Sequence, residues 1–137
     1  REYSSAASDV YKRQDLVLLP TTPQARSVEL TVELSSILRQ MDTMHAALLV
    51  KVDSRKQRLA QEARQILEGF DVDVMQAEIP LLAAFEKAEV EGVCVSNAVD
   101  DRGRADLRRM GGWAAYCQAA VQIRDRLSAA TPDAISA

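Results

Sequence analysis

Three basic side chains, those of Arg55, Lys56 and Arg58, lie within four consecutive residues of the chain. Asp53 and Ser54 precede them, and such short polar residues favour turns and helix starts. The cations therefore fall in the first turn of an expected helix, where positive charge opposes the helix dipole. This local cost favours a binding role for the cations. A solvated basic patch without a ligand is the competing interpretation.

The elements that would position these cations are a buried strand and a helix. The apolar run Ala46–Val50 suits a strand that is covered on both faces. We expect this strand to span about His45–Val52 and the helix to span Arg55 to about Glu68. Ser54 and Gln57 have the spacing of a capping box, in which each side chain satisfies a free amide of the first helical turn.

The same helix carries apolar residues at helical spacing, which indicates a face that packs on the sheet. Gly69 is expected just beyond the helix C-terminus, where a left-handed conformation is common. The residues expected on the apolar face are Leu59, Ala63, Ile66, Leu67 and Phe70.

Further strands and helices alternate along the chain. Two more strands are expected at Asp15–Pro20 and Asp73–Ile79, and proline closes each of them. Three more helices are expected at Ser27–Met41, Leu82–Glu91 and Ala105–Ala129.

The last of these helices contains Gly111 and Gly112, which are expected to kink or break it. Val93–Val99, which precedes it, fits either a short strand or an extended connection. The expected buried stripe of the helix is Trp113, Tyr116, Ala120, Ile123 and Leu127. A membrane-anchoring role for Trp113 and Tyr116 is the alternative, but core packing is favoured.

Strands that alternate with helices predict an α/β fold built from right-handed βαβ units around a parallel sheet. Ligands of such sheets bind beyond the carboxyl ends of the strands. Three loops are expected to meet there: Pro20–Pro23, Val52–Arg55 and Pro80–Ala84.

Composition limits the range of functions. The chain has 137 residues, with 17 Lys and Arg against 20 Asp and Glu, and its formal net charge is −3. The length corresponds to one domain at most. The acidic balance excludes a surface that is basic throughout, as in strong nucleic-acid binders, but it allows a local basic patch. No apolar run approaches the roughly 20 residues that a membrane span needs.

The other residue types that could do chemistry favour structural roles. His45, the single histidine, has no nearby partner to activate it and is expected at the surface or a strand edge. Asp71 and Asp73 are expected in a polar turn rather than in a carboxylate pair. Cys94 and Cys117 lack metal-site spacing and are expected to be free thiols in the core. No catalytic or metal-binding residue is expected.

Residues 4–14 read SSAASDVYKRQ, which matches the in-frame translation of a transposase-type sequencing adapter. Chance does not explain agreement over eleven consecutive positions. We therefore expect residues 1–14 to be a non-native, adapter-derived segment and exclude them from fold reasoning. The natural protein is expected to continue upstream of Asp15.

The ordered loops resemble the C-terminal half of the ParA/MinD family, which are P-loop ATPases with a deviant Walker A motif. ParA-type partition proteins are the most similar. Asp15–Pro20, which reads DLVLLP, resembles the strand after their Walker B motif. Leu48–Leu59 is similar to their pattern L-L-x-x-x-D-x-R-x-x-L, with the last leucine displaced by one residue. Ile79–Gly92 has their I-P pair followed by an alanine and a glycine.

The resemblance implies the C-terminal part of a doubly wound, parallel-sheet P-loop NTPase fold, with about three strands and flanking helices. It assigns residues 15–130 to an incomplete ATPase domain. The small residues of 131–137 separately predict a frayed tail. It further implies a bacterial, cytoplasmic and nucleoid-associated protein that uses ATP and Mg²⁺. Such proteins form homodimers, bind DNA non-specifically, act with a centromere-binding ParB-like protein and need no membrane.

The resemblance also assigns site residues. The positions that would flank the adenine base are Val52, Asp53, Pro80 and Leu81. The positions that would contact DNA are Arg55, Lys56 and Arg58. A cation is suited to this second role, because neutralising phosphates releases counterions whatever the base sequence.

Two departures from the family pattern matter. No G-x-x-x-x-G-K-[ST] motif occurs, so this segment alone has no residues to hold the β- and γ-phosphates. We therefore expect the segment alone to bind neither ATP nor Mg²⁺ and to have no hydrolytic activity. The loop after I-P usually carries arginine, whereas Leu81–Ala84 carries none. A second DNA contact is therefore either absent or moved to a later basic cluster, which could equally be a solvated helix start. That cluster is Arg102, Arg104, Arg108 and Arg109.

Two alternative functions stay open beside the partition ATPase. A related cargo-positioning or conjugation-assisting ATPase would explain the loop without arginine. A non-enzymatic α/β interaction module would explain the missing phosphate-binding loop.

Overall fold

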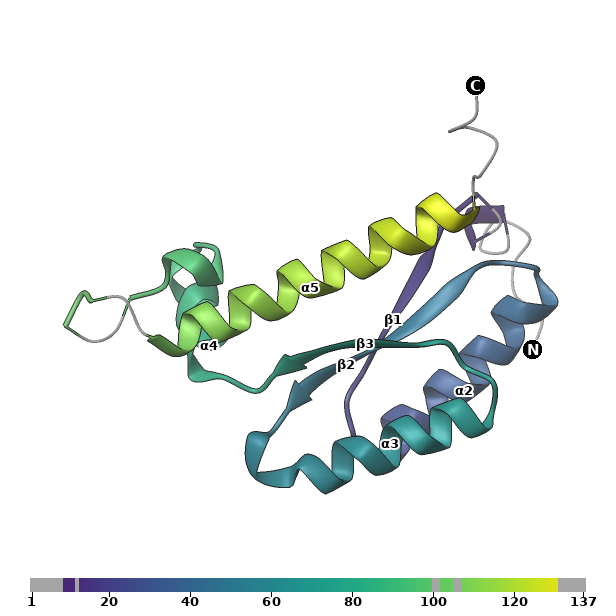
Figure 1. Cartoon of the computed structure of the whole chain (residues 1–137), viewed down its shortest axis with the longest axis horizontal. Helices are drawn as coiled ribbons and strands as arrows, with labels where there is room; N and C mark the ends of the chain where they lie inside the picture. The colour runs from purple at the N-terminus through teal and green to yellow at the C-terminus, as the bar shows by residue number, and fades with distance from the viewer. Residues whose placement is uncertain (1–8, 12, 100–101, 105–106, 131–137) are drawn as a thin grey trace.

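The computed structural model describes residues 9–11, 13–99, 102–104 and 107–130. The expected adapter-derived segment lies mostly, and the expected tail entirely, outside these residues. Within them a sheet of three parallel strands has the order β1-β2-β3 (Figure 1). The strands are β1 (Val17–Thr21), β2 (His45–Val52) and β3 (Val74–Pro80). The predicted α/β fold with a parallel sheet is confirmed, and the middle strand has the predicted bounds.

Helices cover both faces of the sheet (Figure 1). One face carries α2 (Ala25–Gln40) and α3 (Gln57–Gly69), which connect the strands. The other face carries α5 (Leu107–Ala130), and α4 (Ala83–Glu91) lies near the first turns of α5. A 3₁₀ turn at Val95–Asn97 replaces the strand or extended connection that was expected between α4 and α5.

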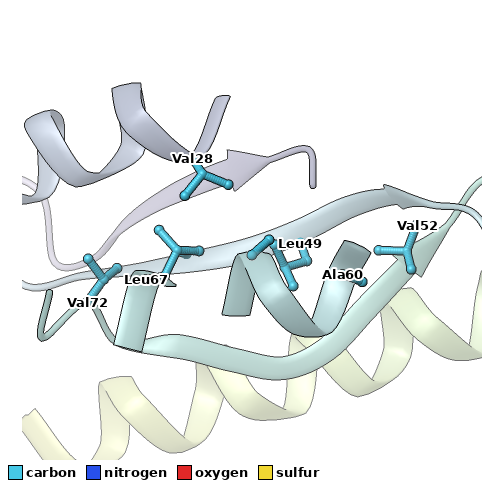
Figure 2. Packing of buried hydrophobic residues seen from close by; sticks show 8 residues of the cluster. Val28, Leu49, Val52, Ala60, Leu67 and Val72 are labelled. Carbon is cyan, nitrogen blue, oxygen red and sulfur yellow. The ribbon is translucent and has the colours of Figure 1, made fainter. Parts of the chain in front are cut away.

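The central strand β2 supplies both halves of the core because successive side chains point to opposite faces. Leu49 and Val52 pack with Ala60 and Leu67 of α3 (Figure 2). On the other face, the partners include Ala119 of α5. That cluster consists of Ala46, Leu48, Met75, Ala77, Ile79 and Ala119. Four consecutive β2 residues, Ala46 to Leu49, are buried, as expected for a strand covered on both faces.

Three helices end in the same way, at a residue in the left-handed conformation. These residues are Asp42 (φ 53°), Asp71 (φ 59°) and Gly92 (φ 67°). The end of α3 is therefore marked by Asp71, and the expectation for Gly69 is wrong, because Gly69 is still helical. Aspartate tolerates this conformation better than most residues. Gly92 ends α4, as expected.

Side chains from both helical layers close the outer edge of β3. Arg64 of α3 donates from Nη1 to the Met75 carbonyl oxygen at 2.9 Å. The Gln122 side chain of α5 accepts from the Ala77 amide at 3.1 Å through Oε1. Met75 and Ala77 are two residues apart, so their backbone groups point to the same side of the strand. This edge is therefore protected against pairing with another strand.

The outer edge of β1 differs. The Val17 amide donates to the Met44 carbonyl oxygen at 2.9 Å, so alternate residues of β1 bond towards β2. Leu18 and Pro20 consequently direct their backbone groups to the other side, where no described strand pairs with them. Since Pro20 has no amide hydrogen, Leu18 supplies the amide for pairing there, and the carbonyl oxygens of Leu18 and Pro20 supply the acceptors.

Helix α5 corrects two expectations, the break at its glycines and the residues of its buried stripe. It is a single helix that passes through both glycines without a break. Trp113 (43% exposed) and Tyr116 (46% exposed) lie outside the buried stripe, whereas Ala119 is buried. The helix turns a different face to the sheet because Gly112 allows close approach to α4: a Cβ there would lie 2.8 Å from Phe85 Cζ.

Two further expectations about buried residues are wrong. Cys94 and Cys117 are both exposed free cysteines rather than core residues. In α3, only some of the residues expected on the apolar face are buried. Ala63 and Leu67 are buried, but Leu59, Ile66 and Phe70 are exposed.

The two glycines of α5 give a matched test of packing. Gly111→Ala should raise the free energy of unfolding by about 1 kcal/mol, because nothing lies within 4 Å of the added Cβ and alanine favours helix. Gly112→Ala should lower it by about 1 to 2 kcal/mol, because Phe85 must move. Urea unfolding of both variants provides the measurement. Equal stabilisation by both substitutions would contradict the close contact with α4.

A second test uses the ion pair that fixes α5 to the start of β3. Arg126 donates from Nε and Nη2 to the Asp73 carboxylate at 2.8 and 2.9 Å. These hydrogen bonds hold the pKa of Asp73 below its ordinary value of 3.8. A carboxylate whose pKa is lower in the folded state contributes stability above its unfolded pKa, and this contribution disappears as pH falls through the folded pKa.

Asp73→Asn should therefore lower the free energy of unfolding at neutral pH by about 1 kcal/mol or less, because the Asp73 side chain is half exposed. The difference from the native chain should shrink as the pH falls below the ordinary aspartate pKa. Urea unfolding across this pH range measures it. Asp125→Asn is the control, since Asp125 and Arg124 form only a 3.7 Å exposed pair. A difference that is independent of pH would contradict the assignment.

Candidate functional site

A cavity of about 180 Å³ lies at the carboxyl edge of the sheet. The segments that follow all three strands meet there, as expected for the three loops. Its lining residues are Thr22, Pro23, Gln24, Lys51, Asp53, Lys56, Leu59 and Leu81. The walls combine apolar side chains with polar and cationic ones, and this combination suits a small ligand that has flat apolar faces and a polar or anionic rim.

Backbone hydrogen bonds hold the loops around this cavity. The Leu81 amide donates to the Val52 carbonyl oxygen at 2.9 Å, which joins the loop after β3 to the end of β2. The Thr22 amide donates to Ser27 Oγ at 3.0 Å, which ties the loop after β1 to the first turn of α2. Lys51, at the end of β2, has a positive φ of 53°, a conformation that few non-glycine residues adopt.

Asp53 organises the turn after β2. Its Oδ1 accepts a hydrogen bond from the Arg55 amide at 3.0 Å and another from Arg55 Nε at 3.2 Å. The expected capping box of Ser54 and Gln57 is wrong, because Asp53 caps the 3₁₀ turn Ser54–Lys56 and α3 begins only at Gln57 without a side-chain cap. A carboxylate can accept from both the amide and the guanidinium, which a hydroxyl does less well.

The electrostatics of the turn follow from these bonds. The hydrogen bond from the Arg55 side chain, followed by the one from its amide, lowers the pKa of Asp53. Asp53 is thus held as an anion beside the cavity, and its charge is already matched by Arg55. Among the residues that line the cavity, Lys51 and Lys56 supply positive charge.

The residues assigned to the adenine base separate into two groups. Asp53 and Leu81 line the cavity. Val52 is buried in the core below it, and Pro80 pairs with Val52 at the end of the sheet, so both support the cavity without lining it. Lys56, which was assigned to DNA, also lines the cavity.

Sequence reasoning missed five lining residues: Thr22, Pro23, Gln24, Lys51 and Leu59. Pro23 and Thr22 belong to a loop that was expected at this edge, so the order of the strands was a sufficient signal for them. Leu59 was instead taken for a core residue, and no sequence signal marks the left-handed conformation of Lys51.

The remaining cations differ in their surroundings. The side chains of Arg55 and Arg58 are 85% and 91% exposed, and each pairs with one carboxylate, of Asp53 and Glu62 respectively. Arg109 has a structural contact, because its guanidinium donates to the Ala98 carbonyl oxygen. Arg102 and Arg104 are exposed, and the side chain of Arg108 lies outside the described residues.

A larger cavity of about 400 Å³ lies at the opposite, amino edge of the sheet. Three aspartates line it, so it disfavours an anionic ligand. Its arginine is also already bonded: Arg39 Nη2 donates to the Phe70 and Asp71 carbonyl oxygens at 3.3 and 3.0 Å. Its lining residues are Arg39, Asp42, Thr43, Met44, His45, Asp71 and Asp73.

His45 has partners, contrary to expectation. Its Nδ1 lies 2.8 Å from the Thr43 carbonyl oxygen, and because a carbonyl oxygen only accepts, Nδ1 is the donor. Nε2 lies 2.6 Å from Ser35 Oγ, so these two atoms share a hydrogen bond. Ser35 is fully buried, so this pair fixes α2 to the start of β2 and offers no accessible nucleophile.

Within the described part of the chain, no group of three or more His, Cys, Asp and Glu side chains could hold a metal ion. No described helix has the length and apolar character needed to cross a membrane. Comparison with known protein families gives no match to the chain. The search of curated proteins gives none either.

A pair of substitutions tests the cap. Asp53→Ala should lower the urea midpoint of unfolding, because the Arg55 amide loses its acceptor and the turn before α3 loosens. Ser54→Ala should leave the midpoint nearly unchanged, since Asp53 provides the cap. A larger decrease in the urea midpoint from Ser54→Ala than from Asp53→Ala would instead support the capping box of Ser54 and Gln57.

Proposed function

We propose that the chain is part of an ATPase of the ParA type within the ParA/MinD family, acting in plasmid or chromosome partition. One observation carries the proposal: the three loops that resemble the family enclose a cavity beside the basic turn at the carboxyl edge of the sheet. Doubly wound sheets bind their ligands at this edge.

The cavity fits the base of a nucleotide. Pro23, Leu59 and Leu81 supply apolar surface for a planar ring, while Thr22 and Gln24 supply polar groups for its edge. Lys51 and Lys56 favour an anionic ligand over a cationic one. We assign the base of ATP to this cavity.

The chemistry of ATP hydrolysis belongs to residues outside this sequence. Phosphoryl transfer needs a backbone cradle, a lysine and a coordinated Mg²⁺ at the phosphates. The chain contains no glycine-rich loop of this type, and its described residues offer no metal site. In the proposal, these residues therefore position the base while an upstream segment supplies catalysis.

The edges of the sheet support an upstream segment. β3 is closed by Arg64 and Gln122, whereas β1 is apolar and pairs on one side only among the described residues. Exposed edges are normally protected by charges, prolines, bulges or covering elements, and β1 carries no charged residue, so that Pro20 is the protective residue of this strand. Further strands of the ATPase would pair there through Leu18.

The basic turn is the proposed DNA contact. Arg55 and Arg58 are highly exposed, and exposed ion pairs such as theirs are weak, so phosphates can compete for both guanidinium groups. Lys56 adds a third positive charge beside them. Non-specific DNA binding, homodimerisation, a ParB-like partner and a nucleoid-associated location complete the proposal.

A second candidate is a related cargo-positioning or conjugation-assisting ATPase. The loop after β3 favours it, because it carries no cation: Leu81 lines the cavity, Leu82 approaches Gly112, and Ala84 is buried. This loop therefore offers no DNA contact of its own. A non-enzymatic α/β module is the third candidate, and it predicts a stable fold for residues 15–137 expressed alone.

The first test is the uninterrupted reading frame upstream of Asp15. The proposal predicts a deviant Walker A loop with its lysine, and a frame without one would contradict every ATPase candidate. The second test is DNA retention by that complete protein. Arg55→Ala should weaken ATP-dependent retention several-fold and reduce its salt dependence by about one counterion, whatever the DNA sequence.

Arg26→Ala is the matched control for the DNA test. Like Arg55, Arg26 is exposed and pairs with one nearby carboxylate, that of Glu29, but it lies on α2, outside the basic turn. Equal effects of both substitutions would indicate a general charge effect, and unchanged, salt-insensitive retention by Arg55→Ala would remove Arg55 as a phosphate contact.

A further inference from the structure

Helix α3 carries more apolar surface than the sheet covers. Ile66 and Phe70 belong to its apolar stripe, yet they are 50% and 59% exposed. Both face α2, and together the two helices form a groove of about 260 Å³ on the outer side of this helical layer. The residues that line the groove are Ala25, Val28, Glu29, Val32, Glu33, Ile66 and Phe70.

The shape of the groove follows from helical spacing. The lining residues of α2 recur every three or four positions, and Ile66 and Phe70 are four apart, so each helix contributes one continuous wall. Val28 is buried at the base of the groove, and Val32 is half-buried beside it. The interior is consequently almost entirely apolar.

The rim of the groove is acidic. Glu29 and Glu33 are the charged residues among those that line it. Glu29 pairs with Arg26 at 2.9 Å, but both side chains are mostly exposed, so the pair is weak and can exchange. No ion pair to Glu33 is found within the described part of the chain.

We propose that this groove binds an amphipathic helical segment of a partner protein, whose apolar side chains fill the groove and whose Lys or Arg side chains face Glu29 and Glu33. Grooves between helices commonly bind amphipathic helices through residues spaced three or four apart. The acidic rim selects a basic segment, and unmatched acidic residues on a partner would be repelled.

A second copy of the chain fits this groove less well. Two grooves that face each other across a two-fold axis would place Glu29 and Glu33 against the same residues of the other copy. The proposal does not depend on the nucleotide site, because the groove and the carboxyl-edge cavity share no lining residue.

The test uses two labelled model peptides of about four helical turns, both with leucine at positions spaced three and four apart. One carries lysine on its flanks and the other glutamate. Fluorescence anisotropy with the full chain should show saturable, salt-sensitive binding of the lysine peptide. The glutamate peptide should bind at least about tenfold more weakly.

Variants locate the binding. Phe70→Ser should weaken binding of the lysine peptide about tenfold, whereas Val90→Ser should not, although Val90 is 88% exposed. The double variant Glu29→Lys and Glu33→Lys should weaken it by a similar factor. Its control, Glu86→Lys with Glu89→Lys on α4, makes the same change in net charge at exposed positions outside the groove.

Amide chemical-shift mapping of the unmodified chain with the lysine peptide removes any dependence on variant folding. Shifts at 25–33 and 66–70 would support the proposal. Shifts confined to other regions, equal binding of the two peptides, or equal effects of the groove and control variants would overturn it. Sedimentation could also show that the chain forms a dimer and that Phe70→Ser dissociates this dimer. That result would overturn the proposal, because a second copy of the chain would then occupy the groove.

Discussion

The parallel pairing of β2 with both of its neighbours is the constraint on which the rest of the structure depends. Because β2 bonds to β1 on one side and to β3 on the other, all three strands end at the same edge. The following loops must then meet there, although they come from widely separated parts of the chain. The burial of Ala46–Leu49 on both faces fixes this register, since a shift by one residue would exchange the side chains between the two cores.

Much of the fold could be predicted because its signals are local. The run from Ala46 to Val50 is apolar without alternation, and the structure gives the strand that contains it the predicted bounds, His45–Val52. The alternation of strands and helices was sufficient for the parallel sheet. Helix ends were predicted where glycine marks them, as at Gly92, and were misplaced where aspartate takes the left-handed position, as at Asp71.

The failures concern how completely one element covers another. Helical spacing shows that Ile66 and Leu67 are apolar neighbours, but only the position of α2 decides that Leu67 is buried and Ile66 is exposed. The same reason explains the exposed side of α5, because contact of Gly112 with Phe85 sets which face meets the sheet. The location of the cavity was predicted, but several of its lining residues were not. Lys51 and Leu59 line it because of the backbone conformation around them, which no local sequence pattern indicates.

The central claim is that the carboxyl edge of the sheet receives the base of a nucleotide. Because the phosphate-binding loop is expected upstream of Asp15, amide chemical-shift mapping of the complete protein during titration with ATP tests it most directly. The account predicts saturable shifts at Thr22, Gln24, Lys51, Asp53 and Leu81, with the amides of Asp42–His45 at the larger, acid-lined cavity unchanged. Saturable shifts of the amides at the amino edge, without shifts of the amides at the carboxyl edge, would contradict it.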